Sequence, residues 1–144
     1  MDTLPPRWLD LQDQVSDFLS SIAEKSKRLE ALHARHVLPG FDDEEVKKRE
    51  EREIEKLTQE ITRAFQGCQR AIRRIDGMVR EEARRPGGLA QGEETMARNL
   101  RIALATRVGE VSTGFRKKQA AYLKSELSQP MVGWGCWMIK RLIR

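Results

Sequence analysis

The feature that most restricts the fold of this chain is the spacing of its apolar residues. In three long segments they recur every three or four residues, the period of an α-helix with one buried face. In the first segment these residues are Trp8, Leu11, Val15, Phe18, Ile22, Leu29 and Leu32. In the second they are Ile54, Leu57, Ile61, Ala64, Cys68, Ala71, Ile75 and Met78, and in the third Leu100, Leu104, Val108, Val111, Phe115 and Tyr122. The spacing predicts helices over about 6–37, 43–83 and 92–127.

Proline and glycine mark the ends of these segments. Pro39-Gly40 follows the first segment and Pro86-Gly87-Gly88 follows the second, and neither run is compatible with a continuing helix. In the second segment, Phe65, Ile72 and Val79 widen the apolar stripe by one position. A stripe of this width suits a helix that touches two neighbours in a bundle. In the third segment, Gln119 occupies a seam position, and Gly109 and Gly114 are interpreted as possible points of close packing.

The order of charges along the chain favours an antiparallel arrangement. Residues 42–60 contain nine acidic and five basic side chains, whereas residues 63–85 contain seven arginines and three acidic residues. The first segment is also acidic early and basic late, and the third follows the same order loosely. Antiparallel neighbours then place opposite charges side by side. We therefore predict an all-α fold, an antiparallel up-down-up three-helix bundle with long helices.

The sequence predicts no catalytic site, cofactor or metal. Cys68 falls on a seam, and the sequence suggests no base beside it that would activate the thiol. The chain has only one other cysteine, Cys136, and two cysteines do not make a disulfide framework. His33 and His36 lie three residues apart without a third ligand at a recognisable spacing, so we expect His36 to complete the seam and His33 to be partly exposed. The net charge of +5 does not indicate nucleic-acid binding, because acidic residues are interspersed and stacking aromatics are missing.

Several sequence blocks resemble a known family. They are PPRW at 5–8, LEALHARH at 29–36, FDDEE at 41–45, IEKLTQEITRAFQGCQRAI at 54–72 and EVSTGFRKKQAAYLK at 110–124. In this order and spacing they resemble the N-terminal regulatory (Habc) domain of syntaxins, the Qa-SNAREs, in the trans-Golgi and endosomal branch. The resemblance covers nearly all of residues 5–127.

The resemblance implies a regulatory domain of a t-SNARE in membrane fusion between endosomes and the trans-Golgi network. Such a domain binds its SNARE helix, an SM-family protein, or both, and the parent protein lies on the cytoplasmic face of these membranes. No SNARE motif or membrane anchor follows residue 127, so we expect this chain to supply only the regulatory half and to be soluble as written. The alternative is a generic helical scaffold without a SNARE role.

Two candidate contact surfaces follow from the residues. A groove between the second and third helices of a monomeric bundle is expected to receive a partner helix, and its candidate residues are Arg70, Arg73, Ile102, Thr106, Thr113 and Arg116. We expect the regulatory domain to occupy residues 1–128 and an atypical apolar and basic tail to occupy 129–144. Tryptophan together with basic residues suits a weak membrane contact, and the tail supplies Trp134, Trp137, Lys140 and Arg141.

Overall fold

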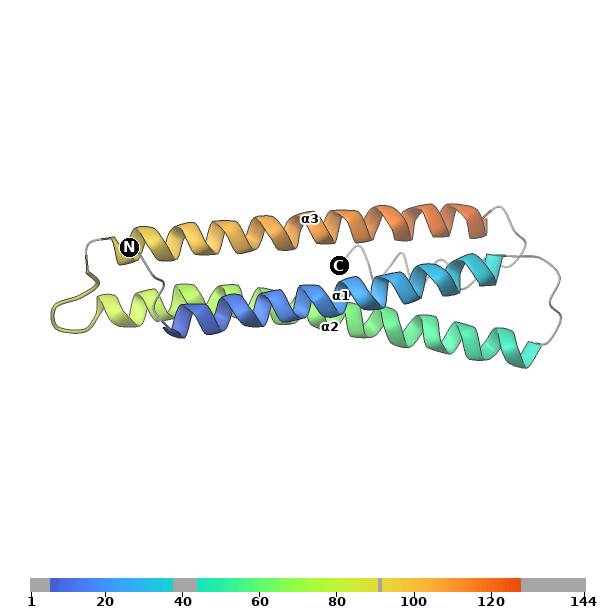
Figure 1. The fold of residues 1–144 in the computed structure, drawn as a ribbon, viewed down its shortest axis with the longest axis horizontal. Coiled ribbons are helices and arrows are strands. Elements are labelled where there is room, and N and C mark those ends of the chain that lie inside the picture. Colours follow the sequence, from blue (N-terminus) through green and yellow to red (C-terminus); the bar gives the residue numbers. More distant parts are fainter. Residues whose placement is uncertain (1–5, 38–43, 91, 128–144) are drawn as a thin grey trace.

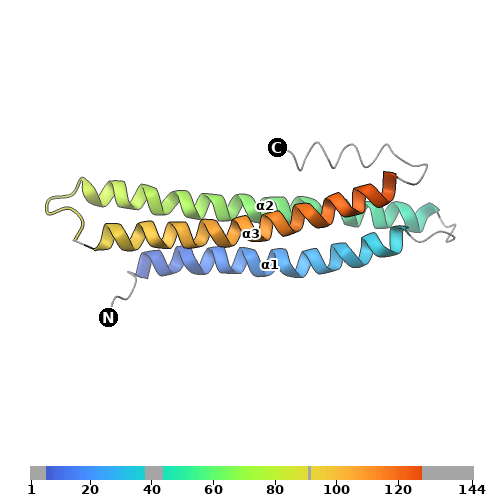
Figure 2. The same ribbon diagram turned by 90° about the horizontal axis from the view of Figure 1, so that it is seen from above.

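The computed structural model describes residues 6–37, 44–90 and 92–127, which form three long α-helices (Figure 1). Helix α1 spans Pro6–Val37, α2 spans Glu44–Ala83 and α3 spans Glu93–Leu127. The helices lie side by side, and α2 runs antiparallel to the other two in both views (Figures 1 and 2). With 40 residues, α2 is about 60 Å long. The predicted up-down-up three-helix bundle is confirmed.

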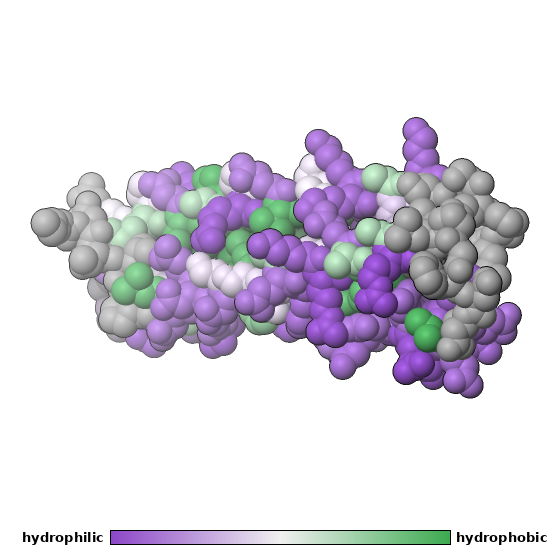
Figure 3. Space-filling view, turned by 45° about the vertical axis from the view of Figure 1, so that its right-hand side comes forward, coloured by the Kyte–Doolittle hydropathy of each residue, from purple (hydrophilic) through white to green (hydrophobic). Residues whose placement is uncertain are grey.

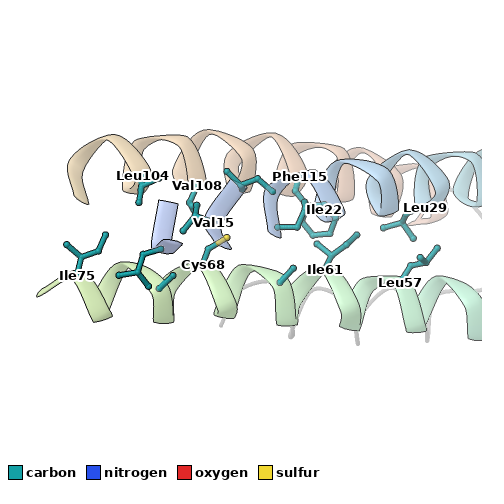
Figure 4. Close-up of a cluster of buried hydrophobic side chains, with 14 of the residues drawn as sticks. Val15, Ile22, Leu29, Leu57, Ile61, Cys68, Ile75, Leu104, Val108 and Phe115 are labelled. Atoms are coloured by element: carbon teal, nitrogen blue, oxygen red, sulfur yellow. The ribbon is translucent and has the colours of Figure 1, made fainter. Parts of the chain in front are cut away.

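The core is a row of apolar side chains along the axis of the rod. Figure 4 shows Val15, Ile22 and Leu29 of α1 pointing toward α2 and α3, which supply the facing side chains. Most of the predicted seam residues are buried, including Trp8, Ile54 and Ile61, which are inaccessible to solvent. The outer surface is mostly hydrophilic, and on the face shown in Figure 3 apolar residues gather in a band along the rod. Burial of these three stripes therefore holds the bundle together.

The seam of α1 differs from the predicted one at one position. Leu19 is buried, whereas Phe18 is only partly buried and packs against the edge of the core. A three-residue step from Val15 leads to Phe18 and a four-residue step leads to Leu19, and both steps are compatible with an α-helix. The structure therefore corrects the seam to Leu19. Met78 and Val111 are also only partly buried.

The partly buried Phe18 lies over a glycine of α2. A methyl group added at Gly67 would lie 2.5 Å from Cζ of Phe18, closer than van der Waals contact allows. By contrast, a methyl group at Gly109 or Gly114 would meet no atom within 4 Å. The interpretation of these two α3 glycines as points of close packing was therefore wrong. The close approach is between α1 and α2, and Gly67 permits it.

Ion pairs follow the predicted charge order at one end of the bundle. The basic second half of α1 faces the acidic first half of α2, and the pairs are Lys25–Glu60 at 3.2 Å, Arg35–Glu50 at 3.0 Å and Arg28–Glu53. At the other end the pair departs from the predicted charge order, because the base, Arg7, lies on α1 and the acid, Glu82, lies on α2. The pairs are partly or largely exposed, so each contributes only about 0–1 kcal/mol. These pairs favour the antiparallel alignment of α1 and α2 but add little to the free energy of unfolding.

Helix α3 is held less closely than α1 and α2 hold each other. Its polar links to α1 include the ion pair Lys118–Glu30 at 3.0 Å and a hydrogen bond of 3.3 Å that Arg107 donates to the Ser16 hydroxyl. Arg101 pairs with Asp76 of α2 at 3.0 Å. The α2–α3 turn includes Gly87, Gly88 and Gly92, all with positive φ, a conformation that costs glycine little.

One buried polar side chain in the α3 seam predicts a stabilising substitution. Gln119 is only 2% exposed, and within residues 6–37, 44–90 and 92–127 its Oε1 has no hydrogen-bond partner. Removing an unsatisfied buried acceptor recovers its desolvation cost, so Gln119→Leu should raise the free energy of unfolding by about 1–2 kcal/mol. Urea denaturation monitored by circular dichroism measures this change. A destabilised Gln119→Leu protein would show that the amide has a partner that stabilises the fold.

Candidate helix-binding groove

A hollow of about 590 Å³ runs between α2 and α3 on the surface of the bundle. From α2 it is lined by Gln69, Ile72 and Arg73, which share one face of the helix. From α3 it is lined by residues at helical spacing, namely Ala105, Val108, Gly109, Ser112, Thr113 and Arg116. Since the lining residues extend over about three turns of α3, the hollow is a groove parallel to the helices.

The floor of the groove is apolar and its α3 wall is low. Val108 is buried and Ile72 is partly buried, so both present aliphatic surface at the base. Ala105 and Gly109 have small side chains or none, and a methyl group added at Gly109 would meet nothing within 4 Å. Small residues on α3 thus leave open the space that a larger side chain would fill. A partner helix would meet aliphatic carbon here rather than charge.

Two arginines form the rims of the groove. Arg73 lies on the α2 rim and Arg116 on the α3 rim, and both side chains are exposed. Among the residues that the structure describes, neither arginine takes part in an ion pair. The groove therefore combines an apolar floor with positive charge on both sides. Its chemistry fits an amphipathic helix with acidic residues flanking its apolar stripe.

The structure brings together three of the six residues predicted for this surface. Arg73, Thr113 and Arg116 line the groove, whereas Arg70 does not and is exposed elsewhere on α2. Ile102 is 53% exposed and also lies outside it, and Thr106 instead donates a hydrogen bond of 2.8 Å to the Ile102 carbonyl. The sequence pattern identifies residues that flank the apolar seams. It does not determine on which side of the helix each of these residues lies.

Six of the nine groove residues were not predicted for this surface. Ile72 and Val108 were predicted only as seam residues, and the other four are Gln69, Ala105, Gly109 and Ser112. The three on α3 are small and stand four and three residues apart, on the same helical face as Arg116. This row of small residues was the available signal for a groove. It was missed because small residues count little in a pattern of hydrophobicity.

A second hollow, of about 330 Å³, lies between α1 and α2 and is mainly charged. Its lining residues are Glu24, Lys25, Arg28, Glu53, Lys56, Leu57 and Glu60. Lys25 pairs with Glu60 and Arg28 pairs with Glu53, so much of this charge is already neutralised within the bundle. This hollow is a weaker candidate for binding than the α2–α3 groove.

The histidine expectation is corrected by the structure. His33 is buried, not partly exposed, and its ring stacks on Tyr122 of α3 with centroids 3.4 Å apart. This contact joins α1 to α3, a role that heptad spacing alone does not reveal. The side chain of His36 lies outside the described part of the structure. In the described residues no group of three or more His, Cys, Asp or Glu side chains could hold a metal ion.

Cys68 is a free thiol in the core. Its side chain is inaccessible to solvent, and burial raises the pKa of the thiol, opposed in part by a backbone hydrogen bond and by the charge of Arg107. A protonated, inaccessible thiol is a poor nucleophile. Cys68 is therefore a small packing residue, as the sequence predicts.

The four residues expected to contact a membrane lie in the tail, outside the described residues: Trp134, Trp137, Lys140 and Arg141. Among the helices that the structure describes, none combines the length and the apolar character needed to cross a bilayer.

Comparison with known proteins identifies related chains, although no family model and no solved structure matches this one. The chain is 36% identical over 125 residues to "t-SNARE affecting a late Golgi compartment protein 2" of Schizosaccharomyces pombe, covering 86% of this chain and 38% of that protein. It is 36% identical over 121 residues to human syntaxin-16, covering 83% and 34%. Syntaxin-43 of Arabidopsis thaliana is 29% identical over 121 residues, covering 84% and 33%.

The chain has a long three-helix bundle and is homologous, over more than four fifths of its own length, to proteins of the syntaxin family. More particularly, it is similar to the trans-Golgi and endosomal branch, which includes syntaxin-16 and the late-Golgi t-SNARE of fission yeast. The chain spans only about a third of the length of these relatives. Syntaxins are not enzymes, and the similarity confirms the prediction that the chain has no catalytic role.

Proposed function

We propose that this chain is the regulatory N-terminal domain of a t-SNARE that acts in membrane fusion between endosomes and the trans-Golgi network. Similarity to late-Golgi t-SNAREs supports the trafficking role, and the three-helix fold supports a regulatory domain formed by residues 1–128. In the parent protein this domain lies on the cytoplasmic face of the membrane. The observation that carries the proposal is the groove between α2 and α3.

In this proposal the groove binds the SNARE helix of the t-SNARE. A SNARE helix has an apolar stripe that it must bury, and Ile72 and Val108 offer an apolar floor along which the stripe can lie. Acidic residues beside the stripe would then pair with Arg73 and Arg116 on the rims. A SNARE helix held in this way is unavailable for the four-helix fusion complex, and an SM-family protein is the expected regulator of its release.

Charge reversal on one rim tests this function. We expect Arg73→Glu to weaken binding of a SNARE helix from a syntaxin-16-type relative by about 10-fold or more, because it removes an attraction and adds a repulsion. Arg70→Glu is the matched control, since Arg70 is exposed on the same helix, three residues earlier, but does not line the groove. Isothermal titration calorimetry with the monomeric bundle measures both affinities. Equal affinities for the two variants would remove the groove from the proposal.

A further inference from the structure

The second half of α2 carries arginines that the bundle does not use. Three of them share one helical face, because Arg70 follows Arg63 by seven residues and Arg74 follows Arg70 by four. Two more, Arg84 and Arg85, follow directly after the helix, which ends at Ala83. We refer to these five residues as the arginine row: Arg63, Arg70, Arg74, Arg84 and Arg85. All five are exposed, and the helical part of the row, from Arg63 to Arg74, extends about 17 Å along α2.

The acidic residues of the same stretch are mostly turned toward other helices. Asp76 pairs with Arg101 of α3 at 3.0 Å, and Glu82 pairs with Arg7 of α1. In residues 63–85 this leaves Glu81 as the one carboxylate without an ion pair to another described helix. No ion pair of the described residues engages any member of the arginine row. Packing thus separates most of the charges and leaves a net cationic face, on which Arg63, Arg70 and Arg74 outnumber Glu81, which follows Arg74 by seven residues.

This cationic face lacks the apolar residues that a protein partner requires. In the described structure the large hydrophobic side chains that are clearly exposed are Leu9 on α1 and Ile102 on α3, so none lies on α2. Stable protein interfaces bury an apolar centre from which charged residues are depleted. The arginine row offers guanidinium groups alone. It differs in this respect from the α2–α3 groove, with its floor of Ile72 and Val108.

We propose that the arginine row binds the phosphate groups of an anionic membrane surface, with α2 lying along the bilayer. Guanidinium groups bind phosphate oxygens in pairs, and a straight row on a rigid helix can place several of them at the headgroup plane together. Each arginine near an anionic surface strengthens binding roughly five-fold. The bundle is thereby held flat on the membrane through charge alone, with no inserted side chain.

The membrane surface and the groove use different faces of α2. Arg70 belongs to the arginine row and does not line the groove, whereas Arg73 lines the groove. Membrane binding therefore leaves the groove accessible to a helix. The proposal does not depend on the function proposed for the groove, and each can fail while the other stands.

Vesicle flotation with the full 144-residue chain tests the proposal. The row variant is Arg63→Gln/Arg70→Gln/Arg74→Gln, and the matched control is Arg98→Gln/Lys117→Gln/Lys124→Gln, which removes the same charge from exposed sites on α3. With vesicles of phosphatidylcholine and phosphatidylserine at low salt, we expect the row variant to bind about 100-fold more weakly than the natural chain. The control should lose less than about 5-fold. About 1 M NaCl should abolish binding, because the screening length falls to about 3 Å.

Several outcomes would overturn the proposal. Equal binding by the natural chain and the row variant would assign the contact to another part of the chain, since the tail is identical in all three proteins. Equal losses in the row and control variants would show that only net charge matters. Failure of the natural chain to float, together with row-dependent binding to an acidic polyglutamate peptide, would assign the row to a protein partner. Circular dichroism of each variant establishes that the bundle is folded.

Discussion

Replacing Ile61 with alanine is expected to lower the free energy of unfolding by about 2–5 kcal/mol. Ile61 is inaccessible to solvent near the middle of α2, where Figure 4 shows it facing Ile22 of α1 and Phe115 of α3. Its removal leaves a cavity that all three helices line, and rigid helices cannot collapse to fill it. A loss of this size is a large fraction of the total stability of a small domain.

Ile102 provides the matched control for this experiment. It is the same residue type in a helix of the same bundle, but it is 53% exposed, so Ile102→Ala should change the unfolding free energy by no more than about 0.5 kcal/mol. Urea denaturation of both variants measures the difference. Similar losses for the two substitutions would contradict a core that runs through the centre of α2.

Gly67→Ala is expected to destabilise the bundle by about 1–3 kcal/mol, although alanine favours helix by about 1 kcal/mol over glycine. The added methyl group would lie 2.5 Å from Cζ of Phe18, so either the ring or the α1–α2 spacing must change. Glycine is normally a poor residue in the middle of a helix. Its presence here reflects the close approach of α1, not flexibility of α2.

Gly77 provides the opposite case on the same helix. A methyl group added there would meet no atom within 4 Å, so Gly77→Ala should stabilise the bundle by up to about 1 kcal/mol. Thermal unfolding of the two variants should therefore shift in opposite directions. A stabilising Gly67→Ala substitution would show that Phe18 swings away at little cost.

The sequence predicts the helices and most of the core because both depend on one quantity, the period of apolar residues. Ile54, Ile61 and Ile75 of α2 are all buried as expected. The period fails where two neighbouring apolar residues are both compatible with it, as for Phe18 and Leu19. It also fails where polar and aromatic groups pair across helices, as for His33 on Tyr122.

The groove was predicted less well than the core, for a physical reason. Its position depends on how α2 and α3 rotate about their axes, and the sequence pattern fixes that rotation only roughly. Arg73 and Arg116 fall on the correct side, but Ile102 faces solvent. Charge order likewise predicts the pairing of Arg35 with Glu50 but not the pair at the opposite end, Arg7 with Glu82.

The unequal packing of the three helices has a consequence for any helix seated in the groove. Helices α1 and α2 form a closely packed hairpin, and α3 rests on it with fewer contacts. A helix that touches both Arg73 and Arg116 would become the fourth helix of the bundle and would hold α3 against the α1–α2 hairpin. The bound helix would add contacts to α3, the helix that the empty bundle holds least closely. Binding in the groove would therefore raise the free energy of unfolding of the bundle.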